Sequence, residues 1–205
     1  MAIDDLTLVK RARGGDQRAF RLLVERYQRK VYSVALGMVK DKEEAMDVAQ
    51  ESFAKVYKYL QHFKGDSSFY TWLYRLTLNS CIDVLRKRAS GKGEHVEFDE
   101  EIQVDLSEAH IGALGARLGT NPQKSLLRRE LAEKIEEALG QLPEKHRAIV
   151  LLRELEGMSY EDLAKALQIP KGTVMSRLFH ARVKLQKLLS EYAELSVSGG
   201  RGEDE

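Results

Sequence analysis

The spacing of the apolar residues constrains the fold of this chain more than any other feature. They recur at three- and four-residue steps along most of the 205 residues. This spacing places them on one face of an α-helix, whereas strand signals are scarce. Helical spacing fails over one long segment, residues 89–124, which holds five glycines, the acidic run EFDEE and the turn TNP. One break of this length predicts an all-α protein with two small helical domains joined by a flexible linker.

Short polar side chains stand where the expected helices begin. Such side chains accept hydrogen bonds from the free N–H groups of a first helical turn, and proline suits that turn because it lacks an N–H group. The residues expected to begin helices are Asp4 or Asp5, Asp16, Asp41, Ser67 or Ser68, Pro143 and Ser159. Together with the break, they predict a first domain over residues 1–90, an acidic linker over 91–124, a second domain over 125–192 and a disordered acidic tail over 193–205.

Composition argues against several classes of protein. No run of about eighteen apolar residues is present, so no membrane span is expected, and the N-terminus lacks the apolar core of a secretory signal. The single cysteine, Cys81, excludes an internal disulfide and favours a reducing, cytoplasmic setting. The five histidines are scattered, and no catalytic pattern or glycine-rich phosphate loop is found. We therefore expect no enzyme activity, no catalytic residue, no metal site and no cofactor.

The net charge of +1 hides an uneven distribution of charge along the chain. Basic residues are in excess over 1–88 and 125–190, whereas acidic residues are in excess over 89–124 and 191–205. Basic blocks favour polyanionic partners such as nucleic acids, although an excess of this size is by itself a weak signal.

Residues 158–186, MSYEDLAKALQIPKGTVMSRLFHARVKLQ, have the pattern of a helix-turn-helix. A short helix capped by Ser159 is followed by the tight turn QIPKG and by a second helix. The residues expected on the buried face of the second helix are Val174, Leu178, Ala181 and Leu185, and those expected on its exposed face are Lys171, Thr173, Ser176, Arg177 and His180. A second helix with polar and basic residues near its start can enter the major groove of DNA. The alternative is an ordinary helical hairpin, but the short turn together with Ser176, Arg177 and Arg182 favours DNA binding.

The segment FYTWLYRL, residues 69–76, holds four aromatic residues, including the only tryptophan of the chain. At about 100° per residue, Phe69 falls on a core face, whereas Trp72 lies at the edge of a polar stripe. That stripe consists of Thr71, Arg75, Asn79 and Arg86. Aromatic planes beside cations suit unstacked bases and their phosphates. The residues alone leave two interpretations open, a surface for nucleic acid or a merely amphipathic helix.

The preceding helix carries an acidic stripe. Glu43, Asp47 and Glu51 recur at four-residue steps with Gln50 beside them, opposite the apolar face that includes Phe53. Such a stripe is usually only solvated, but it can also dock a basic helix of a partner protein.

These motifs together closely resemble one family. The segments DVAQESFAKVYKYL, FKGDSSFYTWLYRLTLNSCIDVLRKR, LPEKHRAIVLLRELEGMSYEDLAKAL and GTVMSRLFHARVKL are similar, in this order, to bacterial RNA polymerase sigma factors of the extracytoplasmic-function (ECF) group, especially the sigma-E-like ones. The resemblance covers roughly residues 1–90 and 125–190. It implies that the first block is sigma domain 2, which binds the polymerase clamp and the minus-ten element. It implies that the second block is sigma domain 4, which binds the minus-thirty-five element.

The resemblance implies a role for each group of candidate residues. The residues expected to bind the clamp helices of core RNA polymerase are Asp47, Gln50 and Glu51. The residues expected at the minus-ten element are Trp72, Arg75 and Asn79 at the melted strand and Arg86, Lys87 and Arg88 near the adjoining phosphates. The residues expected at the minus-thirty-five element are Arg153, Lys171, Thr173, Ser176, Arg177, Phe179 and His180. Sigma-E-like relatives often carry arginine where this chain has Met175 and His180, so the promoter sequence does not carry over.

The resemblance implies an alternative sigma factor that binds core RNA polymerase, through its clamp helices and flap, and starts transcription of a stress or envelope-type regulon. Promoter DNA, as duplex and as melted strand, and an anti-sigma factor are the other partners implied. The linker would run through the polymerase, where EFDEE could imitate nucleic acid. Two alternatives from other classes remain. A stand-alone helix-turn-helix regulator leaves Asn79 and the acidic stripe unexplained, and a protein-binding adaptor leaves the basic second helix unexplained.

Overall fold

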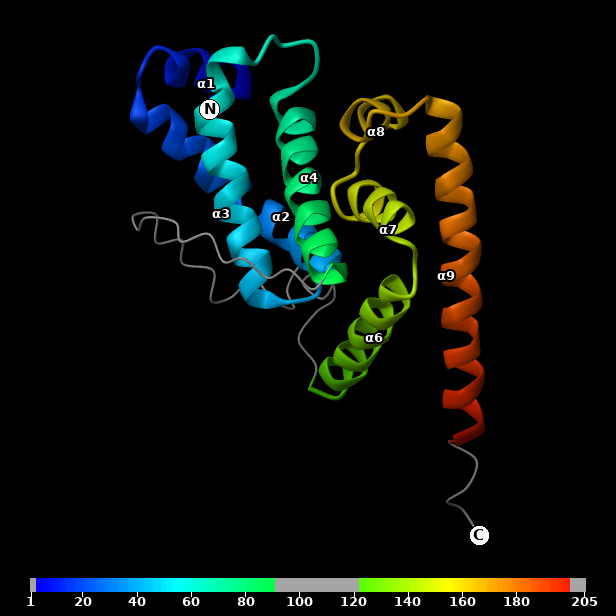
Figure 1. Ribbon diagram of the computed structural model, residues 1–205. Helices are drawn as coiled ribbons and strands as arrows, with labels where there is room; N and C mark the ends of the chain where they lie inside the picture. The colour runs from blue at the N-terminus through cyan, green and yellow to red at the C-terminus, as the bar shows by residue number, and fades with distance from the viewer. Residues whose placement is uncertain (1–2, 91–121, 200–205) are drawn as a thin grey trace.

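The computed structural model describes residues 3–90 and 122–199, and every regular element within these ranges is helical (Figure 1). The elements are, in order, α1 (Asp5–Arg13), α2 (Gln17–Val39), α3 (Lys42–Tyr59), the 3₁₀ turn η1 (Leu60–His62), α4 (Phe69–Ala89), α6 (Pro122–Gly140), α7 (Glu144–Val150), the π-helical turn η2 (Leu151–Leu155), α8 (Tyr160–Leu167) and α9 (Lys171–Gly199). The predicted all-α fold is confirmed. We refer to α1–α4 as the N-terminal group and to α6–α9 as the C-terminal group.

The expected starts of the first helices agree with the structure. The caps of α1, α2, α3 and α4 are the side chains of Asp4, Asp16, Asp41 and Ser68, respectively. Each accepts a hydrogen bond from a backbone N–H group that has no partner within the helix. Of the two serines expected before α4, Ser68 is the cap, because its Oγ atom lies 3.1 Å from the backbone nitrogen of Thr71.

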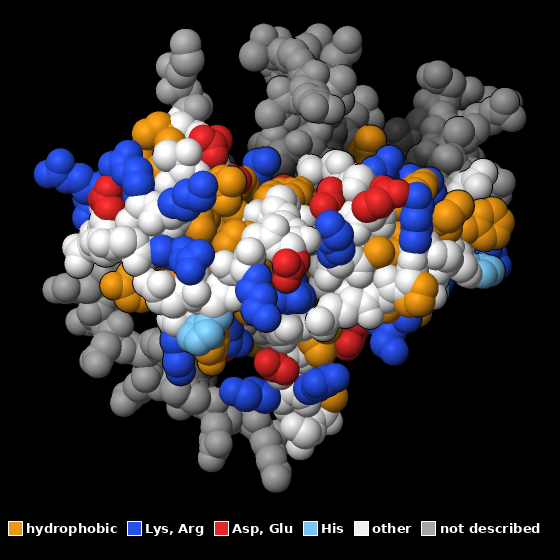
Figure 2. All heavy atoms as spheres, turned by 90° about the horizontal axis from the view of Figure 1, so that it is seen from above, with side chains coloured by type: hydrophobic (Ala, Val, Ile, Leu, Met, Phe, Trp, Pro, Cys, Tyr) orange, Lys and Arg blue, Asp and Glu red, His pale blue; other side chains and the backbone are white. Residues whose placement is uncertain are grey.

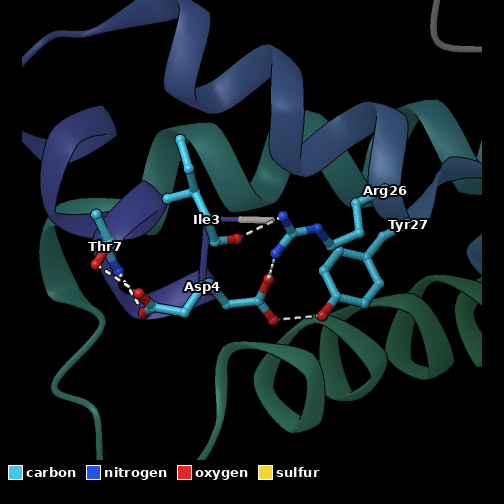
Figure 3. Close-up of polar contacts among 6 residues, drawn as sticks. Ile3, Asp4, Thr7, Arg26 and Tyr27 are labelled. Carbon is cyan, nitrogen blue, oxygen red and sulfur yellow. Dashed lines mark hydrogen bonds and ion pairs between the residues drawn. The ribbon is translucent and has the colours of Figure 1, made fainter. Parts of the chain in front are cut away.

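Polar side chains fasten α1 to α2 (Figure 3). Asp5 accepts hydrogen bonds from Arg26 and from the hydroxyl group of Tyr27. Arg26 also donates to the carbonyl oxygen of Ile3 at 2.6 Å. Burial, together with the neighbouring Asp5 carboxylate, raises the pKa of Tyr27. The Tyr27 hydroxyl therefore stays protonated and remains the donor of this contact.

Two sharp turns shape the C-terminal group. α7 begins after Pro143 and passes directly into η2, and the chain then reverses at Gly157, whose φ of 69° is left-handed. Glycine adopts this conformation without the steric cost that a Cβ atom would bring. Gln168, with φ 53°, ends α8 and starts the turn into α9. Because of this turn, α9 can cross α8 even though only three residues separate the two helices.

The two groups share one continuous apolar core. Leu151 of η2 lies against Gly37 of α2, where an added Cβ atom would stand only 2.8 Å from the Leu151 Cδ2 atom. The buried Arg147 donates to the carbonyl oxygens of Met38 and Gly140, each at 2.8 Å. The sequence predicts two domains on a linker but does not show which residues would join them. In the structure they are packed side by side, with α8 next to α4 and α7 next to α2 (Figure 1).

Two boundaries differ from those expected. α6 begins at Pro122 rather than near residue 125, and α9 continues to Gly199, beyond the expected start of a disordered tail at residue 193. Residues 193–195 are alanine, glutamate and leucine, which favour helix, and the first glycine pair after them stands at 199–200. Most of the expected linker, residues 91–121, and the end of the expected tail, residues 200–205, lie outside the described residues.

Candidate nucleic-acid interface

Helices α8 and α9 form the helix-turn-helix that the sequence predicts. Ser159 caps α8 by accepting a hydrogen bond from the backbone nitrogen of Asp162 at 3.0 Å. The buried residues that these two helices contribute to the core are Leu163, Ala166, Val174, Leu178 and Ala181. Because this face of α9 is buried, the opposite face of its first turns points to solvent and is available to a groove of DNA.

The predicted DNA-binding residues of α9 differ in exposure. Those that are exposed are Lys171, Ser176, Phe179 and His180, and those that are partly buried are Thr173 and Arg177. Lys171 pairs with Glu161 of α8, and this hydrogen bond lowers the pKa of Glu161. The rings of Phe179 and His180 meet edge to face, with their centroids 5.5 Å apart. The exposed groups thus follow one another along the first three turns of α9.

Arg153 lies apart from these residues, on η2. It donates to the carbonyl oxygen of Met158, and its guanidinium group lies over the ring of Tyr160, 5.0 Å from the centroid. Both contacts stabilise the Gly157 turn that leads into α8. In this structure Arg153 therefore positions the helix-turn-helix, a role that the sequence did not predict.

Trp72 lies in the core rather than at the edge of a polar stripe. It is 7 % exposed, and its ring centroid lies 5.0 Å from that of Phe63 and 6.2 Å from that of Phe69. Phe63 belongs to the loop before α4, and the helical periodicity of α4 alone does not reveal where that loop folds. Thr71 is also buried and interrupts the predicted stripe. The expected position of Trp72 is therefore wrong, and in this arrangement it offers almost no surface to a melted strand.

The rest of the polar stripe on α4 is present. Asn79 is exposed although both of its sequence neighbours are buried, and Arg75 is partly buried one turn earlier. Arg86 and Lys87 are exposed at the C-terminal end of the helix. At about 100° per residue, Arg75, Asn79 and Arg86 share one face. This face presents one amide and two guanidinium groups along a single line.

Arg88 is engaged inside the N-terminal group. It donates two hydrogen bonds to the carboxylate of Glu44, one of them at 2.8 Å, and a third to the carbonyl oxygen of Val39 at 2.9 Å. These bonds join the end of α4 to α2 and α3. The predicted contact of Arg88 with a phosphate would therefore compete with bonds that hold the fold together.

The C-terminal group covers one face of α4. The Tyr70 hydroxyl donates to the carbonyl oxygen of Glu156 at 2.8 Å, and the Thr71 hydroxyl donates to Asp162 at 3.1 Å. Lys30 of α2 lies 3.8 Å from the Glu156 carboxylate. Burial and the neighbouring Glu156 raise the pKa of Tyr70, so its hydroxyl remains a donor. The covered face reaches Thr71, the first residue of the predicted polar stripe. The sequence did not predict that the C-terminal group would pack on this face.

The acidic stripe on α3 faces solvent. Asp47 and Gln50 are exposed and Glu51 is partly exposed. Glu51 pairs with Lys55 at 2.8 Å, and Lys55 also donates to Ser80 of α4 at 2.9 Å. A shallow hollow joins the end of this stripe to the basic end of α4, and its lining includes Glu51, Asp83, Arg86, Lys87 and Ser90.

Figure 2 shows that Lys and Arg side chains are spread over the upper face of the molecule among apolar and acidic ones. On the side of α9, at the right-hand edge of the view, apolar side chains adjoin a histidine. Met175 and Val183 are 52 % and 50 % exposed, although neither was among the residues expected on the exposed face of α9. Their four-residue spacing from Phe179, which is 63 % exposed, is the signal that would have placed all three on one face.

Other kinds of site receive no support from the described residues. Within residues 3–90 and 122–199, no three His, Cys, Asp or Glu side chains are grouped so that they could hold a metal ion. Among the helices of these ranges, none is long and apolar enough to cross a membrane. Burial raises the pKa of the Cys81 thiol to about 12, so this cysteine is a poor nucleophile near neutral pH.

Comparison with known protein families gives a match for each of the two helical groups. Residues 23–91 match the family model of Sigma-70 region 2, and residues 132–185 match that of Sigma-70 region 4. The RNA polymerase sigma-H factor of Pseudomonas aeruginosa is 41 % identical over 185 residues, which cover 90 % of this chain and 93 % of the relative. The ECF RNA polymerase sigma-E factor of Escherichia coli K12 is 41 % identical over 182 residues, which cover 88 % of this chain and 91 % of the relative.

Two solved structures share the fold. CnrH, in complex with the cytosolic domain of CnrY, is 24 % identical with a TM-score of 0.65, covering 91 % of this chain and 97 % of CnrH. The sigma factor RpoE from Bartonella quintana, in complex with the anti-sigma factor NepR, is 22 % identical with a TM-score of 0.59, covering 83 % of this chain and 96 % of RpoE.

The helix-turn-helix and the two family matches define a DNA-binding transcription initiation factor. The chain belongs to the sigma-70 family, within its extracytoplasmic-function group, and it acts as an alternative sigma factor that initiates transcription. The family that the sequence motifs resemble is thereby confirmed.

Proposed function

We propose that this sigma factor uses three separate surfaces to direct core RNA polymerase to its promoters. The acidic stripe on α3, with Asp47, Gln50 and Glu51, binds the clamp helices. The polar stripe on α4 binds the minus-ten element as a melted strand, and the exposed face of α9 binds the minus-thirty-five element as a duplex. Residues 1–90 then act as sigma domain 2 and residues 125–192 as sigma domain 4, with the intervening segment as the linker between them.

The exposure of Asn79 carries this proposal. An amide that faces solvent between two buried neighbours contributes little to the core, so its position suits recognition rather than packing. An amide can donate and accept at the same time, and this allows it to read the hydrogen-bonding edge of an unstacked base. Arg75 and Arg86 lie on the same face of α4 and supply positive charge for the phosphates on either side of such a base.

The closed packing of the two groups has a consequence for promoter binding. Tyr70 and Thr71 bond to Glu156 and Asp162, so α8 and the turn before it cover α4 at Thr71, about two helical turns before Asn79. A DNA strand that follows α4 would meet α8 in this arrangement. We therefore include in the proposal that the C-terminal group moves away from α4 when the sigma factor binds the polymerase.

An anti-sigma factor is the regulatory partner that we propose for this chain. The Bartonella quintana RpoE, which shares the fold, was solved with the anti-sigma factor NepR. A partner that holds the closed arrangement would keep α8 on α4 and would also cover Asp47 and Gln50, which are exposed in the free chain. We further propose that the chain needs no cofactor, catalyses no bond chemistry of its own, and works in the cytoplasm, where the polymerase meets the chromosome.

A footprinting experiment tests the proposed function against a stand-alone DNA-binding regulator. Core polymerase, the chain and the reconstituted holoenzyme are each incubated with promoter fragments selected by the holoenzyme, and protection from DNase I is mapped. We expect the holoenzyme to protect two segments, around minus-ten and minus-thirty-five, and the chain alone to protect neither. Equal protection by the chain alone would favour the stand-alone regulator and contradict the proposal.

A further inference from the structure

We propose that Met175 and Phe179 of α9 read the methyl groups of two thymines in the minus-thirty-five element. This inference rests on the proposed function, because it requires α9 to lie in the major groove, but it adds the chemical identity of the bases. It concerns two apolar side chains that stand on the exposed face of a helix whose neighbouring exposed residues are polar.

Three exposed apolar residues of α9 form one stripe. Met175, Phe179 and Val183 are 52 %, 63 % and 50 % exposed and follow one another at four-residue steps. Residues at such steps lie on one face of a helix, one above the other. The face that α9 turns inward includes Val174, Leu178 and Ala181 and is already buried. The stripe is therefore not needed for the core, and contiguous exposed apolar groups mark a contact surface.

The position of the stripe favours DNA as the occupant. Met175 is the fifth residue of α9 and Phe179 the ninth, so both stand in the part of a second helix that reaches base edges. Ser176, Arg177 and His180 lie between and beside them and supply polar and basic groups. In a protein-binding surface, apolar residues at the centre more often have apolar neighbours, and charged residues lie at the rim.

The chemistry of the side chains selects the base. Thymine is the only base that presents a methyl group in the major groove, and apolar side chains are its usual contacts. Methionine has no N–H or O–H donor, so Met175 cannot donate to the N7 and O6 acceptors of guanine. Its unbranched thioether chain adapts to an uneven apolar surface. The base pair that faces Met175 is therefore expected to be an A·T pair with its methyl group turned toward the helix.

The spacing of the two residues predicts the spacing of the two thymines. Four residues of an α-helix rise by about 6 Å, which is roughly two base steps of about 3.4 Å. A helix that lies along the groove then brings Met175 and Phe179 to base pairs about two apart. Val183, another 6 Å or so along the axis, lies farther from the end of the helix that enters the groove, and we assign it no base.

Replacing thymine by uracil tests this inference, because uracil lacks only the methyl group. Holoenzyme reconstituted with core polymerase is bound to a labelled promoter that it has selected from a randomised pool. Each thymine of the minus-thirty-five element is replaced in turn, and the dissociation constant is measured by fluorescence anisotropy. We expect a loss of about fourfold at two positions roughly two base pairs apart, the equivalent of about 0.8 kcal/mol for one methyl group. Met175→Ala should abolish the effect at one position and Phe179→Ala at the other.

Controls separate the possible outcomes. Leu6→Ala, at a residue of α1 that is 54 % exposed, should leave both uracil effects in place. Met175→Arg should shift the preference at its position toward guanine. If the wild-type holoenzyme binds the promoter but no uracil substitution weakens it, or if the effects persist in both alanine variants, the inference is wrong while the proposed function stands. If the holoenzyme selects no promoter at all, the proposed function itself fails.

Discussion

The hydroxyl group of Thr71 in α4 donates a hydrogen bond to the carboxylate of Asp162 in α8, across 3.1 Å and between the two helical groups. Beside it, the Tyr70 hydroxyl donates to the carbonyl oxygen of Glu156. Asp162 also accepts from Ser159, the cap of α8, so the contact joins α4 to the first turn of the helix-turn-helix. These bonds lie beside the stripe that we assign to the minus-ten element, and they link DNA binding by α4 to the position of α8.

Removing these two hydroxyl groups should favour separation of the groups. In the double variant Tyr70→Phe and Thr71→Val the side-chain shapes are kept while two hydrogen bonds between the groups are lost. At about 1 kcal/mol for each bond, the opening equilibrium should shift roughly 30-fold toward the open form. Energy transfer between dyes attached to α2 and α9 measures this shift. Ser33→Ala, which removes a hydroxyl bonded within α2, is the control, and unchanged energy transfer in the double variant would contradict the account.

Asn79→Ala should impair promoter opening and leave polymerase binding nearly intact. The side chain is exposed, so its loss should not disturb the fold, but a flipped base would lose its hydrogen bonds at a cost of about 1–3 kcal/mol. Permanganate reactivity of the melted thymines in the variant holoenzyme is the measurement. Gln17→Ala, which removes another exposed amide, is the matched control. Wild-type reactivity in Asn79→Ala would remove Asn79 from the minus-ten site.

Reversing the charge of the acidic stripe should weaken binding to core polymerase. In the double variant Asp47→Lys and Glu51→Lys, like charges would face a basic partner, and the loss of affinity should shrink as salt is added. Co-purification at several salt concentrations measures it. The control is the double variant Glu25→Lys and Glu136→Lys, which makes the same charge change at two other exposed positions. If both double variants retain polymerase equally well, the stripe is not the binding surface.

Arg88 and Lys87 should give opposite results although they are neighbours in the sequence. Arg88→Ala should lower the free energy of unfolding by about 1 kcal/mol, because it loses three hydrogen bonds, to Glu44 and Val39, in a partly exposed setting. Lys87 is exposed, so Lys87→Ala should leave the free energy of unfolding unchanged. It should make the affinity for the promoter less dependent on salt, by the amount expected for the loss of about one phosphate contact. Urea unfolding and binding titrations against salt separate the two. Equal stability of the two variants would refute the structural role of Arg88.

The sequence predicts the helices and their starts because these depend on local chemistry. Asp16, Asp41 and Ser159 cap helices by bonding to backbone atoms only a few residues away. A capping residue can therefore be recognised from a short stretch of sequence. The buried face of α9 follows in the same way from a spacing of three and four residues. The family motifs supplied the assignment of roles, which helical periodicity alone left open for the aromatic segment and the acidic stripe.

Contacts between distant segments could not be predicted in this way. Trp72 is buried because Phe63 folds over it from the loop before α4, and Arg88 is held by Glu44, 44 residues earlier in the chain. The bond of Thr71 to Asp162 spans 91 residues. No single helical face contains both partners of such contacts, so a pattern along one helix gives the direction of a side chain but not what covers it.

Run-off transcription measures directly whether this chain gives core polymerase promoter-specific initiation. Core polymerase alone, core polymerase with the chain, and core polymerase with the Asn79→Ala variant are supplied with fragmented genomic DNA of the source bacterium, and transcript 5′ ends are mapped. We expect discrete start sites that appear only with the wild-type chain, that share two upstream elements, and that are strongly reduced with Asn79→Ala. If the chain binds the polymerase but yields no start site beyond those of core polymerase alone, it does not direct initiation through the surfaces proposed.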